Sequence, residues 1–460
     1  MAKAKKEEDA ESRFNPYSAL DSQLDNVEKT CGLLTSGMDK SEERQSTGLL
    51  VPNLILSRGL VGGGWYTIFG GESCCKSTLA STFMASCVQS NIPIINYWDY
   101  EGSQEPVYLE QILIAQGVKV PVSEIFGLRH PETSKWIVKP RVRLYNESIA
   151  EKFFDATAKL ERLLPDKIKI DNNYYYVYEH TKDNISLLKG KYDKDYYQMS
   201  GKMRVPAYDS LPQAVLFVDS FPAMNPEGQD VDDPGSAMAI QARMFSEQIK
   251  RIKGKMRRKK VTLVGMNQLR KAPMAYGNPN YEPGGESLKF SSDCRLQVTS
   301  RANPHGKGQI DEELSYDGEG IDKYRYIHIK AIKNKLSTPY LEGMMRVWVE
   351  DSKGAARGMD PVWDCWQYLI MTGQVEGKRN SFRLKFADHP QSEKTMKWQH
   401  FKTLMLGTKE EKVTMCQSIG MKPINIKKAC FEQLATGDGL DRYFGTLHGA
   451  KSKVDEAEDE

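Results

Sequence analysis

The sequence predicts an α/β fold built around a mostly parallel central sheet. Between residues 47 and 349, short apolar runs rich in β-branched and aromatic residues alternate with longer helical patterns. One run leads directly into a glycine-containing loop and an apolar helix, and a later run ends in an aspartate. Alternating strands and helices are typical of parallel sheets covered on both faces, whose buried strands are apolar throughout.

Six apolar runs are the predicted strands, and they are residues 65–69, 92–98, 214–218, 261–266, 295–298 and 324–332. All six lie in a predicted core domain of residues 46–350. A polar segment (1–45) precedes this core, and a largely helical C-terminal domain (351–449) follows it. The chain ends in an acidic tail (450–460).

The stretch between Glu101 and Asp219 holds 117 residues, more than one strand-to-strand crossover requires. We therefore predict an inserted subdomain at about residues 135–208. Its middle combines tyrosines with lysines: Tyr174, Tyr175, Tyr176, Tyr178, Tyr192, Tyr196 and Tyr197 with Lys182, Lys189, Lys191 and Lys194. Such residues can stack bases and hold phosphates, or they can form the strand core of a small subdomain. The sequence leaves both alternatives open.

Composition excludes several classes of protein. Hydrophobic residues make up 40% and charged residues 27% of the 460 positions, as in ordinary globular chains. No apolar stretch approaches the roughly 18 residues of a membrane helix, and the N-terminus has no secretory signal. The eight cysteines lack metal-ligand spacing. We therefore expect a cytoplasmic protein with no membrane partner.

Charge is unevenly distributed, although the net charge is only +3. Residues 250–260 hold eight basic side chains, and the last six residues hold five acids. A basic stripe with an acidic tail suits a DNA-binding protein, but it also suits a solvated helix face with a solubilising tail.

The loop after the first strand has the context of a phosphate-binding site: strand, tight loop and helix N-terminus. Its residues are Gly70, Gly71, Glu72, Ser73, Cys74, Cys75, Lys76, Ser77 and Thr78. Backbone N–H groups would ring the phosphates of ATP, Lys76 would reach the β and γ oxygens, and the Ser77 hydroxyl would ligate Mg²⁺. Cys75 stands where this pattern prefers glycine, because the backbone turns tightly there.

A second element supports the nucleotide site. Residues 215–220 (VLFVDS) form an apolar strand that ends in Asp219. A carboxylate at this position could order the water shell of the magnesium ion, so Ser77 and Asp219 are the candidate metal residues.

Four blocks then make the chain resemble the RecA family of recombinases, including its phage UvsX-type members. The blocks are residues 70–78 (GGESCCKST), 99–108 (DYEGSQEPVY), 265–295 (GMNQLR and then GNPNYEPGGESLKFSSDCR from 277) and 332–340 (IKNKLSTPY). The resemblance implies a RecA-like phosphate-loop ATPase core, with residues 1–45 as an N-terminal polymerisation segment. The long insertion and divergent last hundred residues favour a phage branch, and a phage-encoded protein would work in the cytoplasm of the host cell.

The resemblance also implies the catalytic residues. Glu101 matches the base that orients the attacking water, and Gln268 matches the sensor of the γ-phosphate. Lys333 and Lys335 match a pair that reaches the nucleotide of the neighbouring protomer. Lys76 completes this set.

For the base of ATP, Tyr108 resembles the residue that stacks on adenine, and Glu105 resembles the one that meets the base edge. For DNA, the resemblance implies one loop and helix from residue 236 and a second loop at 270–285. The corresponding candidates are Met238, Arg243, Lys250, Arg270, Gly284 and Gly285.

The implied function is ATP- and Mg²⁺-dependent recombination. The protein would polymerise on single-stranded DNA as a helical homo-filament, pair it with homologous double-stranded DNA and exchange strands. Single-strand-binding and loader proteins are further candidate partners. An alternative is a filament protein that binds ATP and DNA but hydrolyses little because of Cys75. A hexameric helicase on the same core would instead predict an arginine finger in place of the lysine pair.

Overall fold

The computed structural model describes residues 44–170, 173–227, 234–271, 280–306, 308–355, 357–385, 394–422, 424–444 and 446. Almost all of the predicted N-terminal segment, the whole acidic tail and the tip of the second DNA loop (272–279) lie outside these residues. Side chains at 234–238, 271 and 280 also lie outside the description.

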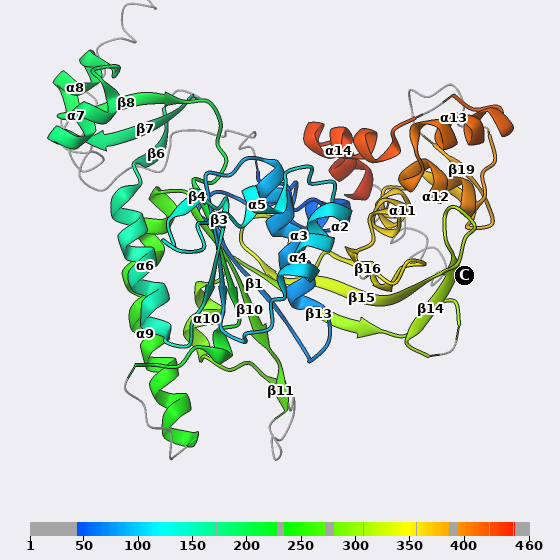
Figure 1. Ribbon diagram of the computed structural model, residues 1–460, viewed down its shortest axis with the longest axis horizontal. Helices are drawn as coiled ribbons and strands as arrows, with labels where there is room; N and C mark the ends of the chain where they lie inside the picture. The colour runs from blue at the N-terminus through cyan, green and yellow to red at the C-terminus, as the bar shows by residue number, and fades with distance from the viewer. Residues whose placement is uncertain are drawn as a thin grey trace, which may run out of the picture.

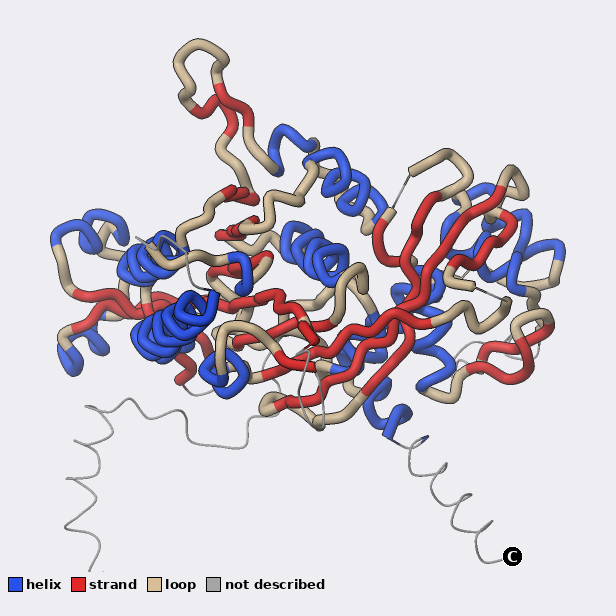
Figure 2. The backbone as a smooth tube through the Cα atoms, turned by 90° about the horizontal axis from the view of Figure 1, so that it is seen from below, coloured by secondary structure: helices blue, strands red, loops and turns tan. Residues whose placement is uncertain are grey.

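The central sheet has ten strands in the order β17-β16-β15-β13-β1-β10-β9-β2-β5, with β14 beside β15 (Figures 1 and 2). The six from β13 to β5 are parallel, and the other four extend the sheet with antiparallel pairing. The predicted mostly parallel sheet is thereby confirmed. The strands are β1 (Trp65–Gly70), β2 (Ile94–Asp99), β5 (Val142–Asn146), β9 (Ala214–Asp219), β10 (Val261–Gln268), β13 (Cys294–Arg301), β14 (Ile310–Leu314), β15 (Ile321–Asn334), β16 (Glu342–Glu350) and β17 (Gly358–Met359).

Helices cover both faces of the parallel strands (Figure 1). On one face lie α2 (Leu50–Ile55), α3 (Lys76–Gln89), α4 (Pro106–Ala115) and α11 (Pro361–Met371), and on the other α6 (Ala150–Leu163), α9 (Pro234–Arg258) and α10 (Glu286–Ser291). Strand β9 shows the alternation: Val215 and Phe217 enter the first core, whereas Leu216 and Val218 enter the second. Both faces are therefore buried.

The predicted insertion divides into two parts. Its first part contributes β5 and α6, which belong to the central sheet and its cover. Its second part is a separate sheet of β6 (Asp166–Ile170), β7 (Asn173–Glu179) and β8 (Lys202–Ala207) with α7 (Lys182–Leu188) and α8 (Lys194–Ser200). Where the predicted insertion begins, β3 (Leu128–Arg129) and β4 (Trp136–Val138) form a hairpin.

The tyrosines of β7 serve as strand residues of this small sheet. Arg204 lies over the rings of Tyr175 and Tyr196, 4.4 and 4.5 Å from their centroids. The small sheet joins the C-terminal end of α9, where Lys259 pairs with Asp166 at 2.9 Å. Helix α9 has 25 residues, about 37 Å of helix. The tyrosines thus lie far from the DNA candidates near the start of α9 (Figure 1).

The C-terminal region packs on the core through α11, whose residues share one apolar cluster with α2 and β16. It continues through β18 (Val375–Lys378), β19 (Ser381–Leu384), α12 (Trp398–Leu406), α13 (Lys409–Ser418) and α14 (Ile426–Thr436). Among the described residues, no helix is both long and apolar enough to span a membrane.

Candidate nucleotide and DNA sites

Four neighbouring parallel strands end at one edge of the sheet. Strands β1 and β10 pair Gly70 with Gln268, and strands β2 and β9 pair Asp99 with Asp219. Because β10 and β9 are also neighbours, the phosphate loop, Asp219 and the segment around Glu101 share that edge. Ligands of open α/β sheets bind outside the carboxyl ends of the strands, so this edge is the candidate nucleotide site.

The phosphate loop has the shape that the sequence predicted, including its strained position. Cys75 has φ 63° and ψ 32°, the left-handed conformation that glycine adopts more easily, and it immediately precedes α3. Ser73 also has a positive φ of 54°. Cys75 therefore takes up the left-handed conformation at the position where the usual pattern has glycine.

Replacing Cys75 by glycine is expected to raise the thermal midpoint, because a left-handed residue with a Cβ costs about 1–2 kcal/mol, partly offset by the freedom of glycine in the unfolded chain. Cys75→Val should lower the midpoint further, since β-branched residues adopt this conformation least readily. Calorimetry of the three proteins checks the order Gly, Cys, Val; a valine variant as stable as the parent would contradict it.

Cys74 and Lys76 both close the loop through the Gly71 carbonyl. The Cys74 thiol donates to this oxygen at 2.9 Å and the Lys76 ammonium at 2.7 Å. Burial raises the pKa of both the Cys74 and Cys75 thiols, with Lys76 opposing the shift. Both sulfurs are therefore favoured as neutral thiols.

Asp219 is buried beneath the loop and well supplied with donors. Its Oδ2 accepts hydrogen bonds from the Tyr97 hydroxyl and the Gln104 amide, both at 3.0 Å. Burial raises the pKa of Asp219 to about 6; a hydrogen bond from Ser77 opposes this, and the nearby charge of Glu101 adds to it. A buried carboxylate beside the Ser77 hydroxyl is a donor set that suits a hard divalent cation.

Glu101 and Gln268, predicted from different blocks, are in direct contact. The Gln268 Nε2 donates to Glu101 Oε1 at 2.9 Å, and the Ser220 hydroxyl donates to the same oxygen at 2.5 Å. Gln268 ends β10, and the Asn267 amide before it donates to the Pro283 carbonyl at 3.2 Å. The site is thus connected to the segment just before the Gly284–Gly285 pair.

The residues predicted for the adenine lie on α4. Glu105 directly precedes this helix and is exposed. Tyr108 is half-buried, and its hydroxyl lies 2.8 Å from the Thr78 hydroxyl, which joins α4 to α3. Burial raises the pKa of Tyr108, so its phenol stays neutral.

Lys333 and Lys335 lie at the opposite edge of the sheet. Lys333 pairs with Arg295, which pairs with Thr67 three residues before Gly70. The Lys333 ammonium donates to the carbonyls of Lys289 and Phe290 at the end of α10, at 2.7 and 3.0 Å. Burial and the neighbouring Lys335 lower its pKa. Lys335 itself is exposed. Neither lysine faces the phosphate loop of its own chain.

Two of the DNA candidates, Gly284 and Gly285, lie where the second loop passes α9. Gly284 and Gly285 have φ of 90° and 77°. A Cβ on Gly285 would lie 2.9 Å from that of Ala242 in α9, and one on Gly284 would lie 2.4 Å from Leu288. These glycines therefore permit the close contact between loop and helix.

The charged DNA candidates face solvent. Arg243 is 81% exposed and pairs with Glu247 at 3.0 Å, and Lys250 is exposed. Arg270 is exposed in β11 (Arg270–Lys271), which pairs with β12 (Asn280–Tyr281). Met238 lies in α9, with its side chain outside the described part.

Much of the basic run at residues 250–260 forms ion pairs with acids of the same chain. The pairs are Arg251 with Asp155, Lys253 with Asp293, Lys255 with Glu161 and Lys259 with Asp166.

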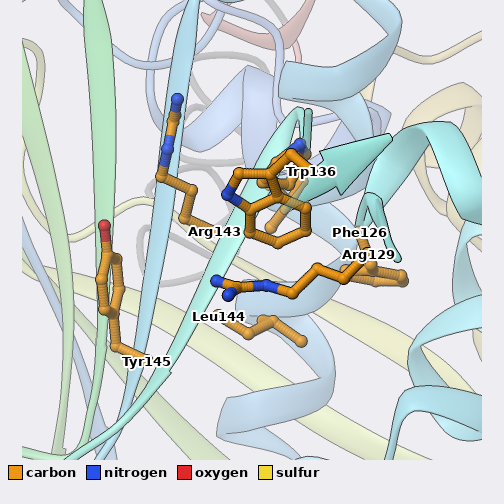
Figure 3. A pocket seen from close by; sticks show the side chains of 8 residues that line it. Phe126, Arg129, Trp136, Arg143, Leu144 and Tyr145 are labelled. Carbon is orange, nitrogen blue, oxygen red and sulfur yellow. The ribbon is translucent and has the colours of Figure 1, made fainter. Parts of the chain in front are cut away.

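A pocket of about 420 Å³ lies at the edge strand β5, away from all these residues. Arg129 lies 4.0 Å from the centroid of the Trp136 ring, beside Arg143 and Leu144 (Figure 3). Since it contains none of the predicted nucleotide ligands, we do not assign the nucleotide to it.

Sequence reasoning missed three side chains of the site, namely Tyr97, Gln104 and Ser220. In the sequence, Tyr97 is one of several apolar and aromatic residues of a predicted strand. Gln104 belongs to no motif and is marked only by its position shortly before Pro106. Ser220 could have been noticed, because a hydroxyl directly follows the strand-end acid.

The fold is an α/β core with a mostly parallel central sheet, and sequence comparison finds similarity to RecA proteins. Residues 208–352 match the family model of the RecA N-terminal domain. Protein RecA of Thermus aquaticus is 29% identical over 164 residues, covering 35% of this chain and 43% of the relative. The RecA protein of Aquifex pyrophilus is 27% identical over 236 residues (50% and 60%), and that of Streptococcus uberis 30% over 206 residues (42% and 51%).

Residues 208–352 are thus similar to the RecA N-terminal domain, and the chain spans about half the length of the RecA relatives it matches. The crystal structure of the RadB recombinase covers 68% of this chain and 98% of its own, with 14% identity and a TM-score of 0.38. The family match begins downstream of the phosphate loop, so the assignment of that loop rests on its geometry.

Proposed function

We propose that the chain is an ATP-dependent recombinase that polymerises on single-stranded DNA, pairs it with homologous duplex DNA and exchanges the strands. The observation that carries this proposal is the Glu101–Gln268 contact at the edge that also holds Lys76 and Asp219. Glu101, the candidate general base, contacts Gln268, which lies just before the β11–β12 hairpin of the second DNA loop. This contact can link ATP hydrolysis to DNA binding.

In this mechanism, loop N–H groups and Lys76 bind the phosphates of ATP, and Tyr108 and Glu105 bind its base. Ser77 and Asp219 would hold Mg²⁺, which when bound supplies positive charge against the phosphate oxygens. Glu101 accepts a proton from the attacking water. Gln268 turns from Glu101 toward the γ-phosphate and so transmits its presence along β10 to the β11–β12 hairpin.

The position of Lys333 and Lys335 favours a role between chains. Because they lie at the edge opposite the phosphate loop, they could reach a nucleotide held by a neighbouring copy in a helical filament. Single-stranded DNA would then run past the start of α9 and the β11–β12 hairpin, with Met238, Arg243, Lys250, Arg270, Gly284 and Gly285 as contacts. We expect recombination by this protein to take place in the cytoplasm, with loader proteins as further partners. We also propose that the protein is of the phage UvsX type.

Lys335→Ala is expected to lower DNA-stimulated hydrolysis about tenfold or more, because a charge supplied across the interface stabilises the transferring phosphate. ATP affinity of dilute protein should not change, since Lys335 is remote from its own loop. Turnover on DNA and analogue binding by dilute protein check this, with exposed Lys353→Ala as the control. Lost affinity in dilute protein would place Lys335 at its own site.

The test of the function is ATP hydrolysis with and without single-stranded DNA, with Lys76→Ala beside it. Stimulation by DNA that disappears in the variant is the expected result. ATP-dependent DNA binding without hydrolysis would support the alternative, a static filament caused by Cys75. Cys75→Gly would then restore turnover. If the protein shows no ATP hydrolysis and no ATP-dependent DNA binding, the recombinase proposal is wrong.

A further inference from the structure

Ser220 directly follows one acid of the site, Asp219, and its hydroxyl donates to the other, Glu101. Ser220 follows Asp219 at the end of β9 and is 1% exposed. It donates to Glu101 Oε1 at 2.5 Å, the oxygen that also accepts from Gln268. Both hydrogen bonds thus fall on one carboxylate oxygen, and Oε2 makes no hydrogen bond to the described residues.

Packing does little to fix the Glu101 side chain. It is exposed, and Gly102 after it has φ 64°, with no atom within 4 Å of where a Cβ would be. A free glutamate side chain samples several rotamers, and fixing one of them costs conformational entropy. Its orientation must therefore come from hydrogen bonds.

The two donors differ in how firmly they are held. Backbone N–H groups of Tyr100 and Glu101 both donate to the Asp219 carbonyl, at 2.6 and 3.2 Å, and the Ala223 N–H donates to that of Ser220 at 3.1 Å. Ser220 is thereby tied to the Glu101 backbone. Gln268 ends a strand, and in the proposed mechanism it leaves Glu101 for the γ-phosphate.

We propose that Ser220 is a positioning residue that keeps the Glu101 carboxylate aimed at the attacking water after Gln268 has turned away. This inference rests on the proposed ATPase function. It assigns a role to the residue after the strand-end acid, distinct from the metal role of Asp219. A base displaced by about 1 Å can lose up to a hundredfold in rate, which sets the expected scale.

The experiment compares wild type, Ser220→Ala and Ser220→Thr, with Ser103→Ala as the control. Ser103 lies on the same segment, is exposed, and its hydroxyl makes no hydrogen bond within the described residues. For Ser220→Ala we expect kcat for DNA-stimulated hydrolysis to fall tenfold to a hundredfold, with KM for ATP and the affinity for a non-hydrolysable analogue unchanged. Ser220→Thr keeps the hydroxyl and should recover most of the rate.

The outcomes separate the inference from the proposed function. If wild type does not hydrolyse ATP, the proposed function fails first. If wild type is active and Ser220→Ala keeps its kcat, the inference is wrong. A parallel loss of kcat, analogue affinity and thermal midpoint also overturns it, because Ser220 would then support the strand end as a whole.

Discussion

Replacing Glu101 by glutamine is expected to lower DNA-stimulated ATP hydrolysis by about a hundredfold to ten-thousandfold, the usual contribution of a general base. The amide keeps the size of the carboxylate and still accepts from Ser220 through its carbonyl oxygen. It cannot take the proton of the attacking water. ATP affinity should stay within about threefold of wild type, because Lys76 and the loop N–H groups bind the phosphates.

Steady-state hydrolysis with single-stranded DNA and the affinity for a non-hydrolysable analogue measure the two effects separately. Glu124→Gln is a suitable control, since this exposed glutamate lies after α4 and outside the site. A Glu101→Gln protein that hydrolyses ATP within a few-fold of wild type would show that another group activates the water.

The fold was predictable because its parallel strands are mostly apolar runs and because the phosphate loop has a recognisable sequence between a strand and a helix. All six predicted strands are present, and the strand-loop-helix around Lys76 is where the sequence placed it. The sheet edge that gathers Lys76, Asp219, Glu101 and Gln268 follows from parallel strands ending together. Strand β5 escaped prediction because RVRLYN alternates charged with apolar residues and lay inside the presumed insertion.

The rest depends on pairing that residue types do not reveal. From the sequence, Lys333 looks like a lysine on the protein surface, yet its ammonium group caps the end of α10. The basic run in α9 suggested a nucleic-acid surface, but α6 supplies acids to two of its side chains. Long-range partners are chosen by the fold, so charge patterns in one segment cannot identify them.

A buried ionic cluster, in addition to the apolar contact through α11, links the core to the C-terminal region, and its partners also come from distant segments. Arg346 on β16 has no exposed side-chain surface, and its guanidinium pairs with Asp360 at 2.7 Å and Glu313 at 2.6 Å. It lies 3.7 Å from the centroid of the Tyr324 ring. Burial acts to raise the pKa of Glu313, but Arg346 and Arg379 outweigh it and hold that pKa at about 2.

Arg346→Met is therefore expected to destabilise the protein by about 3–5 kcal/mol, because Asp360 and Glu313 would be left as buried charges without their main partner. Thermal or urea unfolding measures the effect. Arg243→Met is the matched control, since its ion pair with Glu247 is exposed and should contribute less than about 1 kcal/mol.

A second variant shows whether the loss comes from unpaired charge or from lost packing. Arg346→Met combined with Asp360→Leu removes both members of one pair, so it should be more stable than Arg346→Met alone.

Because the Glu313 pKa is depressed, the contribution of Glu313 to stability is present above about pH 4.5 and is lost as the pH falls toward 2. Wild type should lose stability across that range, whereas Arg346→Met should lose less. Equal losses in the two proteins would mean that Arg346 does not hold Glu313 ionised, and the cluster would then stabilise the C-terminal region through its aromatic contacts.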